Sequence, residues 1–356
     1  MKKKLLFCSY DLNIGGIENA LINLLNNMDY SKYEIDLILE KKEGILLDGL
    51  NDKVNVIEYR VSDCKNIFVR KFKNLFKKMF WIIKNYHKYD FSCCYATYSL
   101  PCNMLSYYGS RNNSIYVHSN YKYIYGEKEL RNFFDLRRIN KFKHIIFVAN
   151  EARKDLIEFY PNIEDKSVVI NNLIDYQKVL DLSKEEVSYD KKTEYLFVFV
   201  GRLEEKSKKL SRMINVVKRL KNVSLLIVGD GPDKKMYDGM IFDCDRINMV
   251  GAKKNPYPYM KLADYVVLSS DYEGFPVVYG EAITLNKKII STIDVSDDFI
   301  SIPNRFGFII SKNEDKMYDE INNILESDGL KYEKVDFSKI NSYKIKKIED
   351  LIDEVK

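Results

Sequence analysis

Short apolar runs rich in β-branched and aromatic residues alternate with helix-length segments along the whole chain, and this alternation limits the fold more than any other feature. A first series of candidate strands comprises Lys4–Ser9, Glu34–Leu39, Val54–Tyr59, Phe91–Ala96, Ser114–His118, Ile145–Ala149 and Val168–Asn171. A second series comprises Tyr195–Val200, Ser224–Val228, Ile247–Val250, Tyr265–Ser269, Lys288–Thr292 and Gly307–Ile310. Helical spacing of apolar residues fills the gaps, as in Ile17–Met28 and Leu210–Leu220. Strands that alternate with helices predict an α/β fold with parallel sheets covered on both faces.

The two series of strands also predict two domains. The chain has 356 residues, and a domain usually takes ~100–200 residues. The segment Ile174–Glu194 between the series is acidic and has no clear strand signal. We therefore predict an N-terminal domain over 1–175, a linker over 176–193, a second domain over 194–335 and a C-terminal helix over 336–356.

Composition excludes several classes of protein. The chain is 46% apolar and 31% charged, which is typical of a globular protein rather than a disordered one. No apolar run approaches the ~18–20 residues that span a bilayer, and the N-terminal apolar stretch breaks at Asp11, too early for a signal peptide. The six cysteines form no C-x-x-C pair, so we expect reduced thiols, no metal site and no cofactor. We expect a cytoplasmic protein.

Positive charge is concentrated in one part of the chain. Residues 51–150 hold 18 Lys+Arg and 7 Asp+Glu, a balance of +11, whereas the rest has 39 and 45, a balance of −6. This block is a candidate surface for phosphates, either of nucleic acid or of an anionic membrane.

The segment Lys65–Lys88 contains eight Lys and Arg residues, no acidic residue and an apolar face at helical spacing. Basic amphipathic helices with Phe and Trp lie on anionic membranes, but a helix packed on a sheet shows the same pattern. Both interpretations stay open, and no nucleic-acid motif accompanies the segment. The membrane hypothesis names Arg70, Lys71, Lys73, Lys77, Lys78 and Trp81.

Two loops after predicted strands carry glycines. Gly15-Gly16 precedes the first helix, where glycine lets the backbone approach an anion and the helix N-terminus attracts negative charge. Gly201-Arg202-Leu203 follows the first strand of the second series, with Lys206, Lys208 and Lys209 close behind. Ligands bind at the carboxyl ends of parallel strands, and Arg and Lys there can neutralise a diphosphate.

Two further motifs follow. Turn geometry explains most of Gly229-Asp230-Gly231-Pro232, with the proline at a first helical position. The segment Asp271–Glu281 runs from a strand into a loop with Glu273 and then into a helix that begins near Pro276. That helix start is a second candidate anion site, and the carboxylates of Glu273 and Glu281 suit a polyhydroxylated ligand because each accepts several hydroxyl hydrogen bonds.

Taken together, these motifs closely resemble the retaining glycosyltransferases of family 4. The resemblance includes the Gly-Gly loop, the strand followed by Gly-Arg-Leu and lysine, the Gly-Asp-Gly-Pro turn, Glu-Gly-Phe-Pro-x4-Glu, and Asn255-Pro-Tyr-Pro-Tyr-Met-Lys-Leu-Ala-Asp264. It covers nearly the whole chain and is strongest over 195–295. It implies the GT-B fold, two facing Rossmann-like domains with the active site in the cleft between them.

The resemblance also implies roles for particular residues. Catalytic roles fall to His118, Arg202, Lys208 and Glu273. Donor binding involves Gly16, Arg202, Lys208, Glu273, Gly274, Phe275, Pro276, Val277 and Glu281. The acceptor side involves Gly15, Gly16 and His118. Counting back from Ile214 favours Lys208 over Lys206 as the lysine on the donor diphosphate. The sequence departs from the family pattern at Gly280 and at Asn286, where Asn replaces a Gly but tolerates the left-handed cap conformation.

The activity implied is retaining, metal-independent transfer of a hexosyl group to a saccharide or lipid-linked acceptor in cell-surface polysaccharide synthesis. The donor is a nucleotide-diphosphate sugar, with UDP sugars preferred by resemblance only. Alternatives are a nucleotide-sugar epimerase or hydrolase of the same fold and a non-catalytic partner of a glycosyltransferase. Asp243-Cys244-Asp245 matches the D-x-D that holds a metal in a different glycosyltransferase fold, although it does not follow a strand.

Overall fold

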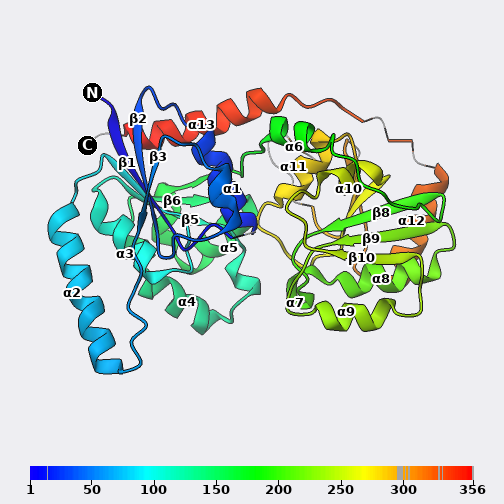
Figure 1. Cartoon of the computed structure of the whole chain (residues 1–356), viewed down its shortest axis with the longest axis horizontal. Coiled ribbons are helices and arrows are strands. Elements are labelled where there is room, and N and C mark those ends of the chain that lie inside the picture. The colour runs from blue at the N-terminus through cyan, green and yellow to red at the C-terminus, as the bar shows by residue number, and fades with distance from the viewer. Residues whose placement is uncertain are drawn as a thin grey trace. The chain divides into compact units, whose positions relative to one another are not determined.

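The computed structural model describes residues 1–13, 15–294, 300, 302–303, 305–327, 329–330 and 332–354. The chain divides into two compact units (Figure 1). Unit 1 comprises residues 1–173 and 338–356, and unit 2 comprises residues 174–337. None of the described helices is both long enough and apolar enough to cross a membrane.

Unit 1 is built on a parallel sheet whose described strands follow the order β3-β2-β1-β4-β5-β6-β7. The strands are β1 (Lys3–Ser9), β2 (Tyr33–Leu39), β3 (Val54–Glu58), β4 (Phe91–Cys94), β5 (Asn113–Val117), β6 (His144–Phe147) and β7 (Ser167–Val169). Strands β1, β4, β5 and β6 are buried along almost their whole length. Covered faces explain why these runs are continuously apolar rather than alternating.

The helices of unit 1 connect these strands. They are α1 (Gly16–Asn26), α2 (Ile67–Asn85), α3 (Leu100–Gly109), α4 (Glu127–Leu136) and α5 (Asn150–Phe159). Short 3₁₀ helices lie at η1 (Ile45–Gly49), η2 (Tyr121–Tyr123), η3 (Ile139–Lys141) and η4 (Pro161–Lys166). Helix α3 packs on β1, β4 and β5.

Unit 2 repeats the design with a second parallel sheet in the order β10-β9-β8-β11-β12-β13. Its described strands are β8 (Tyr195–Val200), β9 (Val223–Val228), β10 (Ile247–Gly251), β11 (Tyr265–Leu268), β12 (Lys288–Ser291) and β13 (Gly307–Ile309). Its described helices are α6 (Tyr176–Leu182), α7 (Glu205–Lys208), α8 (Leu210–Arg219), α9 (Lys234–Ile241), α10 (Tyr257–Leu262), α11 (Val277–Thr284) and α12 (Glu314–Ser327). The predicted α/β class with two parallel sheets is therefore confirmed.

The segment expected to be a linker begins with structure. Asp175 caps helix α6 by accepting from the backbone N–H of Lys178 at 3.1 Å, and Val179 is buried. Helix α6 packs on α10 and α11 of unit 2. Residues 176–182 therefore belong to unit 2 rather than to a linker.

The C-terminal helix α13 (Phe337–Asp353) packs on unit 1, beside β1 and β2 (Figure 1). The Asp353 carboxylate accepts from Lys3 at 2.9 Å and Glu349 accepts from Lys32 at 3.1 Å. Ile348 and Ile352 of α13 are buried. The predicted helix over 336–356 is present up to Asp353, and Val355 lies outside the described residues.

Helix α2 is oriented in an unusual way. Asn74, Trp81 and Asn85 share one side of the helix and face the rest of unit 1, where Asn74 Oδ1 accepts from the N–H of Ser62 at 2.7 Å and Trp81 packs against the core. The apolar residues lie roughly on the opposite side. They are exposed: Phe68 to 81% of its surface, Ile83 to 78%, and Phe72, Leu75, Phe76, Met79 and Phe80 to half or more.

This orientation bears on whether the segment packs on a sheet or lies on a membrane. The apolar face does not pack on the sheet of unit 1. Trp81, however, was expected on the membrane-facing side and lies on the other side of the helix, because its ring fits against the core near Gly109. Lys77 also faces the body of unit 1, with Nζ donating to the Arg60 carbonyl at 2.6 Å and lying 4.8 Å from the Tyr59 ring centroid.

Candidate active site

Lys208 and Glu273 meet at the carboxyl edge of the unit 2 sheet. Lys208 is the last residue of α7, and its ammonium donates directly to Glu273 Oε1. Glu273 lies in the loop after β11 and also accepts from Ser270 Oγ at 2.7 Å. Both side chains are mostly buried, and that of Lys208 is the more exposed. The pair can exchange its internal contact for the charges and hydroxyls of a ligand.

The other cations of the motif lie further out. The Arg202 side chain is 69% exposed and its guanidinium is 3.9 Å from Glu204. Lys206 is also exposed. Lys208 therefore lies beside Glu273, and this structure does not bring Arg202 into contact with that pair.

Backbone contacts fix the loop that carries Arg202. The Gly201 N–H donates to the Val228 carbonyl at 3.1 Å and the Leu203 N–H to the Asp230 carbonyl at 2.9 Å. A Cβ on Gly229 would lie 1.9 Å from the Gly201 oxygen. The glycines of Gly229-Asp230-Gly231 therefore allow two loops to touch backbone to backbone. Pro232 was expected at a first helical position, but it precedes Asp233, the N-cap of α9, because the turn is longer than predicted.

Helix α11 begins where the sequence predicts. Pro276 is its N-cap and Val277 its first helical residue, so the first N–H groups belong to Val277 and Val278. Gly274, Phe275 and Pro276 are buried just before it. Asn286 adopts φ +55°, which confirms the left-handed cap expected of it.

Gly280 in α11 has a packing reason. A Cβ at this position would lie 2.3 Å from Ile174 Cγ1, so the helix passes too close to Ile174 for any side chain. The close approach of α11 to Ile174, within unit 2, thus explains the glycine at this position, where the sequence departs from the family pattern.

Glu281 has partners that the sequence did not indicate. Its Oε1 accepts from the hydroxyl of Tyr257, on α10, at 3.1 Å. Burial raises the pKa of Glu281 to about 7, against the smaller opposing effects of Tyr257 and Lys178. Its place in the Asn255–Asp264 motif is the one sequence signal for Tyr257, whereas Lys178 lies in the segment predicted to be a linker.

His118 lies at the carboxyl end of β5 in unit 1. It is 8% exposed, its ring stacks on Tyr116, and its Nε2 is 3.0 Å from the Tyr95 carbonyl. A carbonyl only accepts, so Nε2 carries the proton and Nδ1 is an acceptor. Among the described residues Nδ1 has no hydrogen-bond partner. Burial lowers the pKa of His118 to about 3, so the ring is neutral and suits a hydroxyl donor.

The N-terminus of α1, at Gly15-Gly16, already has a carboxylate beside it, that of Glu18. Helix α1 begins at Gly16, and the Glu18 carboxylate folds back so far that a Cβ on Gly15 would lie 2.1 Å from Glu18 Oε2. The predicted negative charge at this N-terminus is therefore already supplied by Glu18.

The carboxylates of Asp243-Cys244-Asp245, the alternative metal motif, form ion pairs with lysines. Asp243 accepts from Lys218 at 2.5 Å and Asp245 from Lys192 at 3.1 Å, and both carboxylates are exposed. No cluster of three or more His, Cys, Asp or Glu side chains that could hold a metal occurs within the described ranges.

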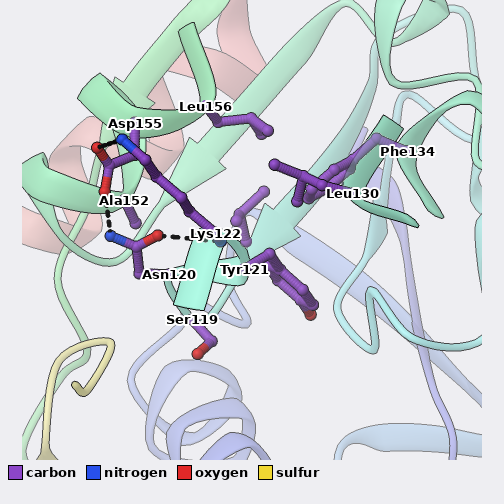
Figure 2. A pocket seen from close by; sticks show the side chains of 10 residues that line it. Ser119, Asn120, Tyr121, Lys122, Leu130, Phe134, Ala152, Asp155 and Leu156 are labelled. Carbon is purple, nitrogen blue, oxygen red and sulfur yellow. Dashed lines mark hydrogen bonds and ion pairs between the residues drawn. The ribbon is translucent and has the colours of Figure 1, made fainter. Parts of the chain in front are cut away.

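A small pocket lies beside η2 in unit 1 (Figure 2). Its polar side is a closed network in which Asp155 accepts from Lys122 at 2.9 Å and from Asn120 at 2.6 Å, as Figure 2 shows. Leu130, Phe134 and Leu156 form its apolar side. None of the predicted site residues lines it, and Asn120, Lys122 and Asp155 are already paired with one another.

Comparison with known families matches both units. The family described as Glycosyltransferase Family 4 matches residues 14–178, and the family described as Glycosyl transferases group 1 matches residues 194–327.

Individual proteins agree with these matches. The chain is 24% identical to the N-acetylgalactosamine-N,N'-diacetylbacillosaminyl-diphospho-undecaprenol 4-alpha-N-acetylgalactosaminyltransferase of Campylobacter jejuni, over 90% of each protein. It is 30% identical to an uncharacterized glycosyltransferase of Methanocaldococcus jannaschii, but over 43% of this chain and only 40% of that protein. The fold matches Anabaena HepE in complex with UDP and glucose, with a TM-score of 0.78 at 16% identity over 98% of this chain and 99% of that one. The chain is thus a glycosyltransferase of the GT-B fold, with a family 4 N-terminal region.

Proposed function

We propose that this glycosyltransferase transfers a hexosyl group, with retention, from a nucleoside-diphosphate sugar to a saccharide or lipid-linked acceptor hydroxyl in the synthesis of a cell-surface polysaccharide. UDP sugars are the preferred donors. The observation that carries the proposal is the contact between Lys208 and Glu273 beside the start of α11, because it combines a cation for phosphate with a carboxylate for sugar hydroxyls.

In the proposed reaction, the bond between the anomeric carbon and the diphosphate oxygen breaks while negative charge grows on the leaving group. Lys208, Arg202 and the N–H groups at the start of α11 stabilise that charge, which makes a metal unnecessary. Glu273 binds hydroxyls of the transferred sugar, and Glu281 binds the ribose. The acceptor oxygen bonds to the same face of the anomeric carbon, and a leaving-phosphate oxygen takes its proton.

Calorimetry with a panel of nucleoside diphosphates, followed by NMR of the product, tests this proposal. We expect UDP to bind most tightly, turnover to persist in excess chelator, and the product to keep the anomeric configuration of the donor. Loss of turnover in chelator, restored by manganese, would contradict metal independence. Free sugar or an epimerised donor as the sole product would favour hydrolysis or epimerisation, and an inverted anomer would contradict retention.

We further propose that the enzyme works at the inner face of a membrane and that helix α2 attaches it there. Lys71, Lys73 and Lys84 border the exposed apolar side of α2, whereas Arg70 and Lys78 lie nearer to Asn74 on the helix. None of these five basic side chains forms a hydrogen bond or ion pair with the residues described. Helices of this kind lie in the headgroup region with the apolar side inserted. The curated relative in Campylobacter is named for an undecaprenol-linked acceptor, which supports a lipid-linked acceptor here.

Vesicle flotation tests the attachment. Each basic residue near an anionic leaflet contributes ~1 kcal/mol, so the wild type should float with anionic but not neutral vesicles at 0.1 M salt, where the Debye length is ~10 Å. Changing Arg70, Lys71, Lys73 and Lys78 to Gln should abolish flotation. A control with the same change in charge replaces the exposed Lys128, Lys154, Lys235 and Lys254 by Gln and should float as the wild type does.

A second variant separates insertion from charge attraction alone. Phe72, Phe76 and Phe80 changed to Ser keep every charge of α2 and should nevertheless weaken flotation. Flotation of this variant at the wild-type level would mean that α2 adsorbs without inserting. A wild type that fails to float with anionic vesicles at low salt would remove the membrane proposal and leave the donor reaction untouched.

A further inference from the structure

Two tyrosine rings lie together at the carboxyl edge of the unit 1 sheet. Tyr10 follows β1 and Tyr98 follows β4, and their ring centroids are 6.1 Å apart at an interplanar angle of 58°. Tyr98 is 41% exposed. The Lys41 ammonium, just after β2, lies 5.2 Å from the Tyr10 ring centroid.

The carboxylate of Glu18 lies beside these rings. Its Oε1 accepts from the Tyr98 hydroxyl at 3.3 Å. Burial raises the pKa of Glu18, and the nearby Asp11 raises it further. Asp11 and Glu18 both disfavour a phosphate at this place, because like charges repel. They favour neutral hydroxyl groups, which donate hydrogen bonds to carboxylate oxygens.

Hydrogen bonds from a buried arginine hold the loop that carries Tyr98. Arg137 is buried, and its guanidinium donates to the carbonyls of Thr97 at 2.6 Å, Tyr98 at 2.7 Å and Phe133 at 2.7 Å. Because the buried guanidinium of Arg137 binds this loop, Tyr98 has a fixed position. A group held in a fixed position binds a ligand with a smaller loss of entropy.

The same loop holds His118. The Tyr95 carbonyl in this loop is the partner of His118 Nε2, which leaves Nδ1 as a buried acceptor without a partner among the described residues. The edge of unit 1 therefore combines an aromatic pair, in which Tyr98 is exposed and Tyr10 is half-buried, with a carboxylate and an unsatisfied neutral acceptor.

From these contacts we infer that Tyr10, Tyr98 and Glu18 form a binding site for an uncharged sugar ring of the acceptor. The tyrosine rings cover the apolar face of the sugar, and Glu18 accepts from its hydroxyls. This inference rests on the proposed transfer reaction and deepens it, since it assigns the recognition of the acceptor to its sugar rather than to a phosphate.

Saturation-transfer NMR with methyl α- and β-glycosides of glucose, galactose and N-acetylglucosamine tests the site. Methyl glycosides have no alkyl chain that α2 could bind. At least one should bind the wild-type protein. Tyr98→Ala should lose most of the signal, Tyr98→Phe should keep much of it, and Glu18→Gln should raise the dissociation constant about tenfold, or ~1.4 kcal/mol. Tyr86→Ala, at another exposed tyrosine of unit 1, is the control and should bind normally.

Three results would overturn the inference: no glycoside binds the wild type, Tyr98→Ala binds as well as the wild type, or pyrophosphate displaces the glycoside and binds Glu18→Gln more tightly. UDP calorimetry on the same variants should show no change. If glycoside binding depends on Tyr98 but UDP-sugar turnover is absent from every sample, the acceptor site stands and the proposed transfer reaction fails.

Discussion

Helices α2 and α8 are both amphipathic but have opposite surroundings. Each is basic on one side and apolar on the other, yet the apolar residues of α8, such as Met213 and Ile214, are fully buried while those of α2 are exposed. The cations differ in the same way. Arg212 and Lys218 of α8 pair with Asp271 and Asp243, at 2.7 and 2.5 Å, whereas most cations of α2 have no partner among the described residues. Helical periodicity therefore identifies an apolar face but not what covers it.

We expect the largest difference between α2 and α8 in how far truncation of an apolar side chain lowers the free energy of unfolding. Ile214→Ala in α8 leaves a cavity and should lower the free energy of unfolding by ~2–5 kcal/mol. Phe76→Ala in α2 removes an exposed ring and should change it by no more than about 0.5 kcal/mol. Urea unfolding measures both. A loss above 2 kcal/mol in Phe76→Ala would show that α2 is covered in solution.

Donor binding should depend on Lys208, which ends α7 just before α8, and not on α2. Lys208→Ala removes a charge-assisted contact worth ~1.5–3 kcal/mol, so UDP affinity should fall by roughly 10- to 150-fold. Lys206→Ala, at an exposed neighbour, should have a much smaller effect. Lys78→Ala in α2 should leave UDP affinity unchanged. Equal affinity in wild type and Lys208→Ala, measured by calorimetry, would remove Lys208 from the donor site.

The partnered cation of α8 should matter more than an unpartnered one of α2. Arg212 joins α8 to Asp271, two residues before Glu273. Arg212→Gln should therefore weaken UDP binding by several-fold through a shift of the Glu273 loop, whereas Lys71→Gln should not. Arg212→Lys, which keeps the charge, should restore part of the affinity. If the Gln variant binds UDP normally, α8 supports the sheet but does not position the loop.

The smallest effect concerns pH. The pKa of Glu281 is raised to about 7, above its ordinary value near 4.3, so its contribution to stability is full at acidic pH and is lost as pH rises through about 7. UDP binding should need the carboxylate, so affinity should increase between pH 6 and 8. Glu281→Gln should flatten this increase and isolate it from titration of the phosphates. Vesicle attachment should not follow the same curve, because α2 contains no acidic residue.

Much of the fold could be predicted because each strand and most helices are marked by local patterns. Predictions failed where a distant contact decided the outcome. Trp81 was placed on the wrong side of α2 because only the core near Gly109 selects its orientation. Residues 176–182 looked like a linker because α6 depends on packing against α10 and α11.

In the candidate site, too, a contact that follows from motif order could be predicted, whereas a contact that depends on packing could not. The contact of Lys208 with Glu273 follows from motif order, since both lie at carboxyl ends of neighbouring strands, β8 and β11. The partnership of Tyr257 with Glu281 depends on how α10 and α11 pack, which no spacing in the sequence encodes. The exposed position of Arg202 was likewise not predictable.

The path of the chain has a consequence for how the protein is made. Unit 2 is one continuous segment, whereas unit 1 is completed by α13, whose Ile348 and Ile352 are buried against it. During synthesis the ribosome therefore releases every residue of unit 2 before unit 1 has its last helix. The N-terminal unit, although made first, is the last to acquire its complete surface.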